Sequence, residues 1–175
     1  MSILKVARIG HPVIRTPATE VTKGAIQGAD FQRLIDDMVE TMYDYDGVGL
    51  AAPQVHVSLR LAVLEVPSSD DRTEEGFPLT VLVNPKVAAL GEEILPGVEG
   101  CLSIPDLRGE VPRYEQVRLE ALDRRGKPYT LTASGFLARV IQHECDHLDG
   151  RVYLDRMRDM RSLAFLREFR RTAQS

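Results

Sequence analysis

The chain has 175 residues, of which 43% are hydrophobic and 27% are charged, an ordinary composition for a globular protein. This length suits one domain with a substantial core, so we expect a single domain over residues 1–175. The net charge of −4 gives no general reason to expect nucleic-acid binding, and no apolar run is long enough to span a bilayer, so neither DNA nor a membrane is an expected partner.

The N-terminal third predicts an extended arm followed by one helix. Two prolines oppose helix formation in residues 3–21, and this segment also lacks the uninterrupted apolar core of a secretory signal, so we expect a cytoplasmic location. Apolar residues then recur at helical spacing, which predicts an amphipathic helix from Asp30, as its N-cap, to about Asp44.

Residues 47–54 have the sequence GVGLAAPQ, a run of small residues that ends in one long amide. Glycines allow the backbone to approach a ligand closely, which favours a binding segment. A turn between a helix and a strand explains the same composition equally well. Taken alone, this segment leaves both interpretations open.

The central part of the chain has short apolar segments, separated by turn residues, that predict a mostly antiparallel sheet. We expect a polar surface loop over residues 67–78 and strand breaks at Asn84-Pro85 and at Gly91. The expected strands are 59–66, 79–83, 87–90, 92–95 and 111–122, the last forming a hairpin with 129–133.

Cys101 lies between a glycine and an apolar residue at the end of a predicted strand. A buried small hydrophobe is the commonest fate of a free cysteine, and a metal ligand is the alternative. A cytoplasmic compartment would disfavour a disulfide with Cys145.

The helix expected over residues 136–148 contains the sequence His-Glu-x-x-His, and Gly150 suits its C-terminal cap. His143 and His147 are four residues apart, so they project from one helical face within reach of one metal ion. Glu144 lies beside them, placed to accept a proton from the water that such a metal activates. Catalytic sites of this kind use three protein ligands, so a third must come from elsewhere. Cys145 points away from the metal face.

The last segment, residues 159–171, predicts a helix with arginines outside its apolar face. A solvated surface explains these arginines, and contact with ribosomal RNA is the alternative. Together these elements predict an α+β fold in which antiparallel β-sheets pack around a central HExxH helix, with an amphipathic helix near the N-terminus and a helix at the C-terminus.

Three segments together are far more specific than any one of them. GVGLAAPQ at 47–54, EGCLS at 99–103 and QHECDHL at 142–148 occur in the order and spacing of the three signature motifs of peptide deformylases, and the chain resembles that family over essentially its full length. The resemblance implies that Cys101, His143 and His147 bind one divalent metal ion. It also implies iron(II) as the physiological ion, with zinc, nickel or cobalt as other occupants.

The resemblance further assigns roles to four other residues. Glu144 would be the general base and then the general acid, while the side chain of Gln54 and the backbone N–H of Leu102 would stabilise the oxyanion. Val48, Gly49 and Leu102 would border the substrate. The implied reaction is hydrolysis of the N-terminal formyl group of formyl-methionyl nascent peptides, which releases formate.

Arg139 departs from some relatives, in which an aliphatic residue lines the methionine pocket one turn before His143. Either its side chain turns away to pair with a carboxylate such as Glu99, or the pocket is less apolar than usual. Glu99 and Asp146 are both candidates for orienting the imidazoles.

Two other functions compete with this reading. A zinc peptidase is suggested by HExxH alone, but no histidine follows His147 to complete a peptidase-like site. A non-catalytic, ribosome-associated metal-binding protein is suggested by the arginine-rich C-terminal segment, but Glu144 and Gln54 are both retained.

Overall fold

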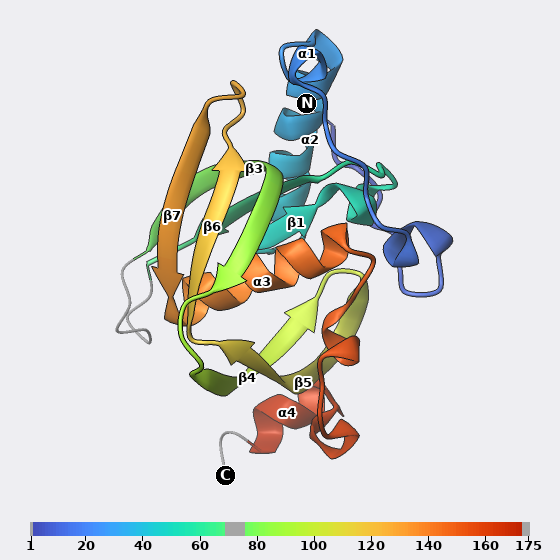
Figure 1. Ribbon diagram of the computed structural model, residues 1–175. Helices are drawn as coiled ribbons and strands as arrows, with labels where there is room; N and C mark the ends of the chain where they lie inside the picture. The colour runs from blue at the N-terminus through green and yellow to red at the C-terminus, as the bar shows by residue number, and fades with distance from the viewer. Residues whose placement is uncertain (1, 69–75, 173–175) are drawn as a thin grey trace.

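A computed structural model describes residues 2–68 and 76–172 (Figure 1). Two sheets form an α+β structure with a helix at the C-terminal end, as predicted, and neighbouring strands are antiparallel throughout both sheets. The order is β1-β2-β3-β6-β7 in the larger sheet and β4-β5-β8 in the smaller. The strands are β1 (Gly49–Ala51), β2 (Leu61–Val66), β3 (Phe77–Ala89), β4 (Ile94–Cys101), β5 (Ile104–Tyr114), β6 (Gln116–Leu122), β7 (Pro128–Ser134) and β8 (Ala164–Phe165); the α-helices are α1 (Lys23–Ile26), α2 (Ala29–Asp44), α3 (Gly135–Leu148) and α4 (Leu166–Thr172).

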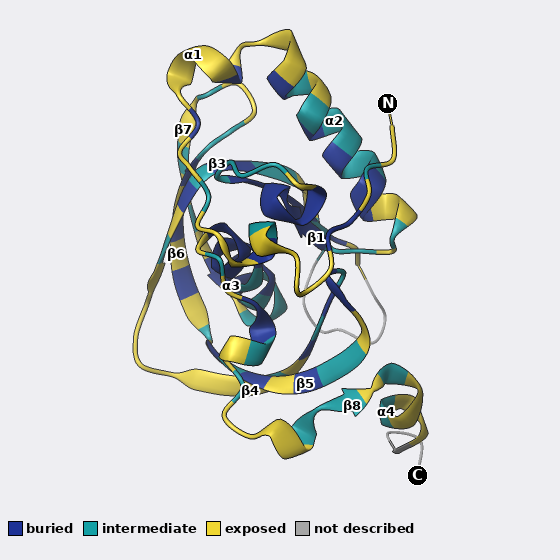
Figure 2. Cartoon of the chain, turned by 90° about the vertical axis from the view of Figure 1, so that its right-hand side faces the viewer, coloured by how far each residue is buried: buried dark blue, intermediate teal, exposed yellow. Residues whose placement is uncertain are grey.

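Helix α2 packs one face against β1 and β2, and Figure 2 shows buried and exposed residues alternating along it. Phe31, Ile35 and Met38 belong to its buried face. The predicted N-cap at Asp30 is wrong, because Gly28 has the extended cap conformation and α2 begins at Ala29. Asp30 instead lies in the first turn, where its charge complements the helix dipole.

Strand β3 continues through Asn84 and Pro85, so the predicted break there is wrong. Asn84 has a φ of 50°, and the pairing with β6 shifts register between Val83 and Lys86, so that Pro85 lies in a bulge. The side chain of Asn84 accepts from the N–H of Val21 and donates to its carbonyl oxygen, which holds the arm against this bulge. Of the loop predicted over 67–78, residues 69–75 lie outside the described residues, and β3 already begins at Phe77.

The strand predicted over 111–122 is divided at Glu115 into β5 and β6, which belong to different sheets. At this crossing the side chain of Gln142 accepts from the N–H of Tyr114 at 3.1 Å and donates to its carbonyl oxygen at 2.9 Å. Gln142 therefore satisfies the backbone groups of Tyr114, and a helix side chain compensates for the interrupted ladder.

Helix α3 contacts strands of both sheets and lies between them (Figure 1). Ala138, Ile141, Cys145 and Leu148 point into the apolar core that α3 shares with the larger sheet. His143 and Glu144 lie on the side that faces the smaller sheet and β1.

The C-terminal α-helix begins only at Leu166, after a short 3₁₀ helix at Met160–Ser162, so the helix predicted from residue 159 is too long. The backbone groups of Ala164 and Phe165 pair instead with Arg108 and Leu107 of β5, which forms β8. Within the described residues, no helix combines the length and the hydropathy needed to cross a bilayer.

Candidate metal centre and active site

The structure brings Cys101, at the end of β4, beside His143 and His147 on α3. One donor atom from each of the three residues lies within 4.8 Å of the others, and Sγ of Cys101 is 3.2 Å from Nε2 of His147. A thiolate and two imidazoles suit a divalent transition metal, and such a set leaves a fourth position for water or substrate. The residues present therefore fit a catalytic metal ion.

The charges around these ligands favour the thiolate. Burial alone would raise the pKa of the Cys101 thiol, but the imidazoles of His147 and His143 lower it well below its usual value. Burial likewise opposes protonation of His143, yet Cys101 and Glu99 raise its pKa well above the usual value. A cation is thus electrostatically favoured where these side chains meet, and a metal ion supplies that charge.

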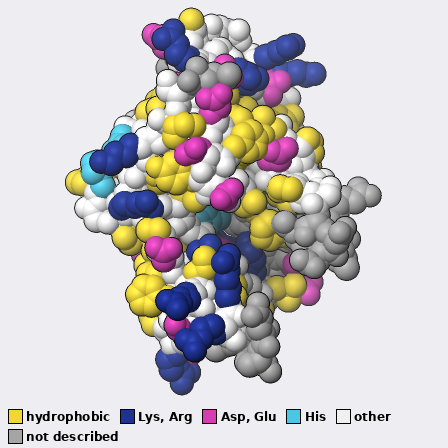
Figure 3. Space-filling view, turned by 180° about the vertical axis from the view of Figure 1, so that it is seen from behind, with side chains coloured by type: hydrophobic (Ala, Val, Ile, Leu, Met, Phe, Trp, Pro, Cys, Tyr) yellow, Lys and Arg dark blue, Asp and Glu magenta, His cyan; other side chains and the backbone are white. Residues whose placement is uncertain are grey.

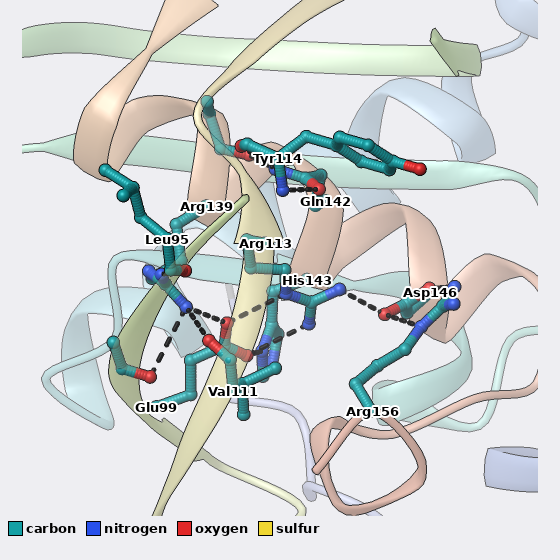
Figure 4. A network of polar contacts seen from close by, with 12 residues as sticks. Leu95, Glu99, Val111, Arg113, Tyr114, Arg139, Gln142, His143, Asp146 and Arg156 are labelled. Atoms are coloured by element: carbon teal, nitrogen blue, oxygen red, sulfur yellow. Dashed lines mark hydrogen bonds and ion pairs between the residues drawn. The ribbon is translucent and has the colours of Figure 1, made fainter. Parts of the chain in front are cut away.

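Of the two carboxylates that the sequence offers for orienting an imidazole, Glu99 is the one that contacts His143. Its Oε2 lies 2.9 Å from Nδ1 of His143, and both carboxylate oxygens accept hydrogen bonds from Arg113 (Figure 4). Burial would raise the pKa of the Glu99 carboxyl, but hydrogen bonds from Arg113 and His143 lower it to about 2. Because Nδ1 of His143 is committed to Glu99, its Nε2 is the nitrogen left for a metal.

Asp146 does not bind an imidazole. It accepts hydrogen bonds from Arg113 and Arg156 and so extends the buried charge network away from the metal ligands (Figure 4). Among the described residues, Nδ1 of His147 has no hydrogen-bond partner.

Arg139 turns toward Glu99, which is the first of the two alternatives raised by the sequence. Its guanidinium donates to Oε1 of Glu99 at 2.9 Å and to the carbonyl oxygens of Leu95 at 2.9 Å and Val111 at 2.8 Å (Figure 4). The guanidinium therefore joins β4 to β5 through backbone groups, and its charge is paired with Glu99.

Glu144 is 4% exposed, and no hydrogen-bond partner for its Oε2 is found among the described residues. Burial raises the pKa of its carboxyl group. A buried carboxylate oxygen without a protein partner is unusual, and a water or substrate proton can satisfy it. Gly49 makes room for this carboxyl group, because a Cβ there would lie 2.3 Å from Oε1 of Glu144.

Gln54 is 2% exposed and follows β1 in a short 3₁₀ turn, Ala52–Val55. Its Oε1 accepts from the N–H of Ala51 at 2.9 Å, and its Nε2 lies 3.2 Å from Oγ of Ser103 and 3.6 Å from Sγ of Cys101. The amide is therefore oriented with its N–H groups toward the thiol. Leu102 directly follows Cys101 in the turn that joins β4 to β5.

Two of the three candidate ligands, Cys101 and His143, line a cavity of about 450 Å³. In Figure 3 the surface seen from behind is hollowed near its middle, and a histidine side chain is visible inside the hollow. The predicted substrate-binding residues Val48, Gly49 and Leu102 all line this cavity. Several other residues that line the cavity were not predicted from the sequence, among them Arg8, Val98, Arg108, Phe136 and Val140.

The positions of Phe136 and Val140 in the cavity could have been predicted from helical periodicity, because these residues lie seven and three residues before His143 on the same helical stripe. Arg8 is far from every motif along the chain, and the residues near it in the sequence give no indication that it lines the cavity. The other two histidines, His11 and His56, lie outside the three motifs, are both exposed and form an edge-to-face pair with ring centroids 4.7 Å apart.

A buried cysteine and two histidines meet around one point in front of a cavity, and beside them lies a buried carboxylate whose Oε2 has no partner among the described residues. This arrangement is typical of a metal-dependent hydrolase. Comparisons with known proteins give the particular family. The family model for polypeptide deformylase matches residues 3–162. The chain belongs to the polypeptide deformylase family and is therefore a metalloenzyme that removes the formyl group from nascent polypeptides.

Individual members of the family are similar in sequence to this chain over most of their length. The chain is 41% identical to peptide deformylase 2 of Pseudomonas putida over 93% of this chain and 92% of that protein. It is 46% identical to the peptide deformylase of Azotobacter vinelandii over 89% of this chain and 87% of that protein.

Solved structures of the family superpose closely on this fold. A Met-Ala-Ser-bound class I type b peptide deformylase from Acinetobacter baumannii gives a TM-score of 0.84 at 36% identity, over 90% of this chain and 100% of that chain. An actinonin complex of the peptide deformylase from Synechococcus elongatus gives 0.80 at 37% identity, over 93% of this chain and 82% of that chain.

Proposed function

We propose that Cys101, His143 and His147 hold one divalent metal ion, and that Glu144, Gln54 and Leu102 carry out deformylation beside it. The observation that carries this proposal is the meeting of the three donor atoms within 4.8 Å of one another, next to a Glu144 oxygen with no partner among the described residues. When bound, the ion supplies a Lewis acid that activates water and polarises the formyl oxygen.

Glu144 moves the proton in this reaction. Its carboxylate accepts a proton from water as the water attacks the formyl carbon, and it then delivers that proton to the amine of the departing methionine. The raised pKa caused by burial makes the protonated form of Glu144 accessible for the second step. Gly49 keeps this carboxyl group close to β1.

Gln54 and Leu102 stabilise the negative charge that develops on the formyl oxygen. Oε1 of Gln54 accepts from the N–H of Ala51 and Nε2 donates to Oγ of Ser103, so the amide is held with Nε2 toward Cys101 before substrate arrives. The backbone N–H of Leu102 adds a second donor from the neighbouring turn.

The cavity accepts the N-terminal formyl-methionine of a peptide. Val48, Gly49 and Leu102 border the substrate backbone, and Phe136 and Val140 add apolar surface for the methionine side chain. The related structure with bound Met-Ala-Ser supports a methionyl peptide as the ligand class. A formyl carbon carries only a hydrogen, so a narrow cleft can admit it and exclude internal amides.

Iron(II) is the proposed physiological ion, and zinc, nickel and cobalt are proposed occupants of the same site. A thiolate and two imidazoles bind each of these ions, and metal availability decides among them as much as affinity does. The test is formate release from formyl-Met-Ala-Ser by protein purified without oxygen and loaded separately with each ion. Cleavage of an internal bond in unformylated peptides, with no formate release, would instead support a peptidase.

We also propose that α4 brings the enzyme to the ribosome in the cytoplasm. Arg167, Arg170 and Arg171 are exposed, and Figure 3 shows Lys and Arg side chains gathered at the lower end of the molecule, where α4 lies. Replacing these three arginines with glutamate should weaken binding to purified ribosomes and leave hydrolysis of a free tripeptide unchanged. Unchanged ribosome affinity would contradict this part of the proposal.

We infer that residues 1–175 form one catalytic domain in which both sheets are organised around the HExxH helix α3, with α2 as an amphipathic N-terminal helix. The contacts of α3 with strands of both sheets and the buried face of α2 support this architecture. Limited proteolysis should then release no smaller stable fragment that retains the bound metal.

A further inference from the structure

The N-terminal arm contacts the turn that carries the proposed backbone oxyanion donor. Nη1 of Arg8 donates to the carbonyl oxygen of Leu102 at 2.6 Å, and the N–H of Ile9 donates to the carbonyl oxygen of Ser103 at 2.9 Å. Two consecutive residues of the arm therefore bind two consecutive carbonyl groups of the turn, although they lie more than ninety positions apart in the sequence.

The same arm also holds the other proposed donor. The N–H of Ala7 donates to the carbonyl oxygen of Gln54 at 2.7 Å, and Ala7 is 3% exposed in the core cluster that contains Cys101. The side chain of Gln54 in turn donates to Oγ of Ser103, which is fully buried. The arm, the segment of Gln54 and the turn thus form one closed set of hydrogen bonds around Cys101.

The turn needs such support because its own backbone does not have the favoured hairpin conformation. Cys101 pairs with Ile104, so Leu102 and Ser103 form a two-residue loop between β4 and β5. Two-residue hairpin loops favour turn types with a positive φ at one or both residues, and neither Leu102 nor Ser103 has one. The orientation of the Leu102 N–H therefore depends on contacts from outside the hairpin.

We propose that Arg8 is a positioning residue for formyl hydrolysis. Its hydrogen bond to the Leu102 carbonyl fixes the turn so that the Leu102 N–H, together with the Gln54 side chain, is aimed at the position where the oxyanion forms. A charged donor makes the stronger kind of hydrogen bond to a carbonyl, so arginine suits this exposed site. The inference rests on the roles proposed above for Gln54 and Leu102.

Arg8 also lines the cavity, so direct contact with the peptide is the competing explanation for any effect of replacing it. The two explanations differ in what they change. Direct peptide binding is equal in the ground state and the transition state, so its loss raises KM and weakens product binding. Misdirected oxyanion donors lower kcat and leave the affinity for the deformylated product unchanged.

The experiment compares Arg8→Ala, Arg8→Lys and the control Lys5→Ala, which removes an exposed cation from the same arm, three residues earlier and outside the cavity. For each metal-loaded enzyme, kcat and KM are measured with formyl-Met-Ala-Ser, and the dissociation constant is measured for Met-Ala-Ser. For each protein loaded with zinc, a diamagnetic ion, the backbone amide signals of Leu102 and Ser103 are recorded by NMR. Thermal unfolding verifies that each variant is folded.

We expect Arg8→Ala to lower kcat about tenfold, less than the roughly hundredfold or greater loss typical when an oxyanion donor is removed, with KM and product affinity within about twofold. Arg8→Lys should recover most of kcat, and the turn amides should shift in Arg8→Ala but not in Lys5→Ala. A rise in KM with weaker product binding and unchanged kcat would overturn the proposal. Unchanged NMR signals of the Leu102 and Ser103 amides in Arg8→Ala would overturn it too.

Gln54→Ala, measured in parallel, separates this inference from the proposed function on which it rests. Undiminished kcat in Gln54→Ala would contradict the oxyanion role of Gln54 itself, whatever the Arg8 variants show. A large loss in Gln54→Ala combined with wild-type kcat in Arg8→Ala would contradict only the positioning role of Arg8.

Discussion

The Cα of Gly49 approaches the carboxyl group of Glu144 so closely that a Cβ on Gly49 would lie 2.3 Å from Oε1 and 2.7 Å from Cδ of Glu144. The first motif therefore needs a glycine because the third motif places Glu144, the proposed general base, against β1. The glycine makes room for a protein side chain, in addition to bordering the cavity that receives substrate.

Gly49→Ala should displace the Glu144 carboxyl group and reduce kcat about a hundredfold, because a displacement of the order of 1 Å at a catalytic group has this effect. Metal content should remain unchanged. The matched control is Gly24→Ala, since a Cβ at Gly24 would meet no described heavy atom within 4 Å beyond its chain neighbours and the backbone of its own helix. Wild-type kcat in the Gly49 variant would show that Glu144 tolerates the shift or does not act in catalysis.

Arg113→Met should destabilise the protein more than any surface charge replacement. Arg113 is 5% exposed and pairs with both Glu99 and Asp146, so its removal leaves two buried carboxylates without this partner. Breaking such a buried network typically costs about 3–5 kcal/mol in the free energy of unfolding. Urea denaturation measures this cost.

The control for this prediction is Arg118→Met, which removes an exposed ion pair with Glu120. Exposed pairs contribute less than about 1 kcal/mol, so this variant should unfold close to the wild-type urea concentration. Equal destabilisation by both replacements would contradict the importance given to the buried network.

The enzyme should not prefer an acidic first residue, although Arg139 lines its cavity. The guanidinium already donates to Glu99, Leu95 and Val111, so it has little capacity to bind a substrate carboxylate. We expect kcat/KM for a formyl-glutamyl peptide to be at least about a hundredfold below that for the formyl-methionyl peptide. Comparable values would show that the guanidinium turns into the cavity during binding.

The alkaline stability of the enzyme should depend on Tyr129. Burial, with smaller effects of Asp123 and Cys145, raises the pKa of its hydroxyl from 10.0 to about 12. Because the folded-state pKa is the higher one, this contribution to stability is fully present below pH 10 and is lost as the pH rises toward 12. Tyr129→Phe should show a smaller loss of stability over this interval in urea denaturation. An identical loss would contradict the prediction.

Much of the site could be predicted because its parts are local sequence patterns. His143, Glu144 and His147 follow from helical periodicity, and Cys101 and Gln54 lie inside short motifs whose order is distinctive. The side chains that support them could not be predicted in this way. Arg113 reaches Glu99 and Asp146 only because β5 crosses α3, and no short sequence motif indicates that crossing.

The errors in the predicted fold have the same origin. A proline normally ends a central strand, yet Pro85 is tolerated because Asn84 forms a bulge and binds Val21 of the arm. The apolar spacing near Phe165 suggests a helix, but the free edge of β5 pairs with that backbone. In both places a contact between segments far apart in the chain overrides the local preference.

The most direct test of this account compares formate release by the wild-type enzyme and by Glu144→Gln, each purified without oxygen, with the metal content of each determined. Glutamine keeps the shape of the side chain but cannot accept the proton, so we predict metal content equal to wild type and kcat lowered at least about a hundredfold. Formate release by the variant at the wild-type rate, with the metal in place, would contradict the central claim that Glu144 transfers the proton.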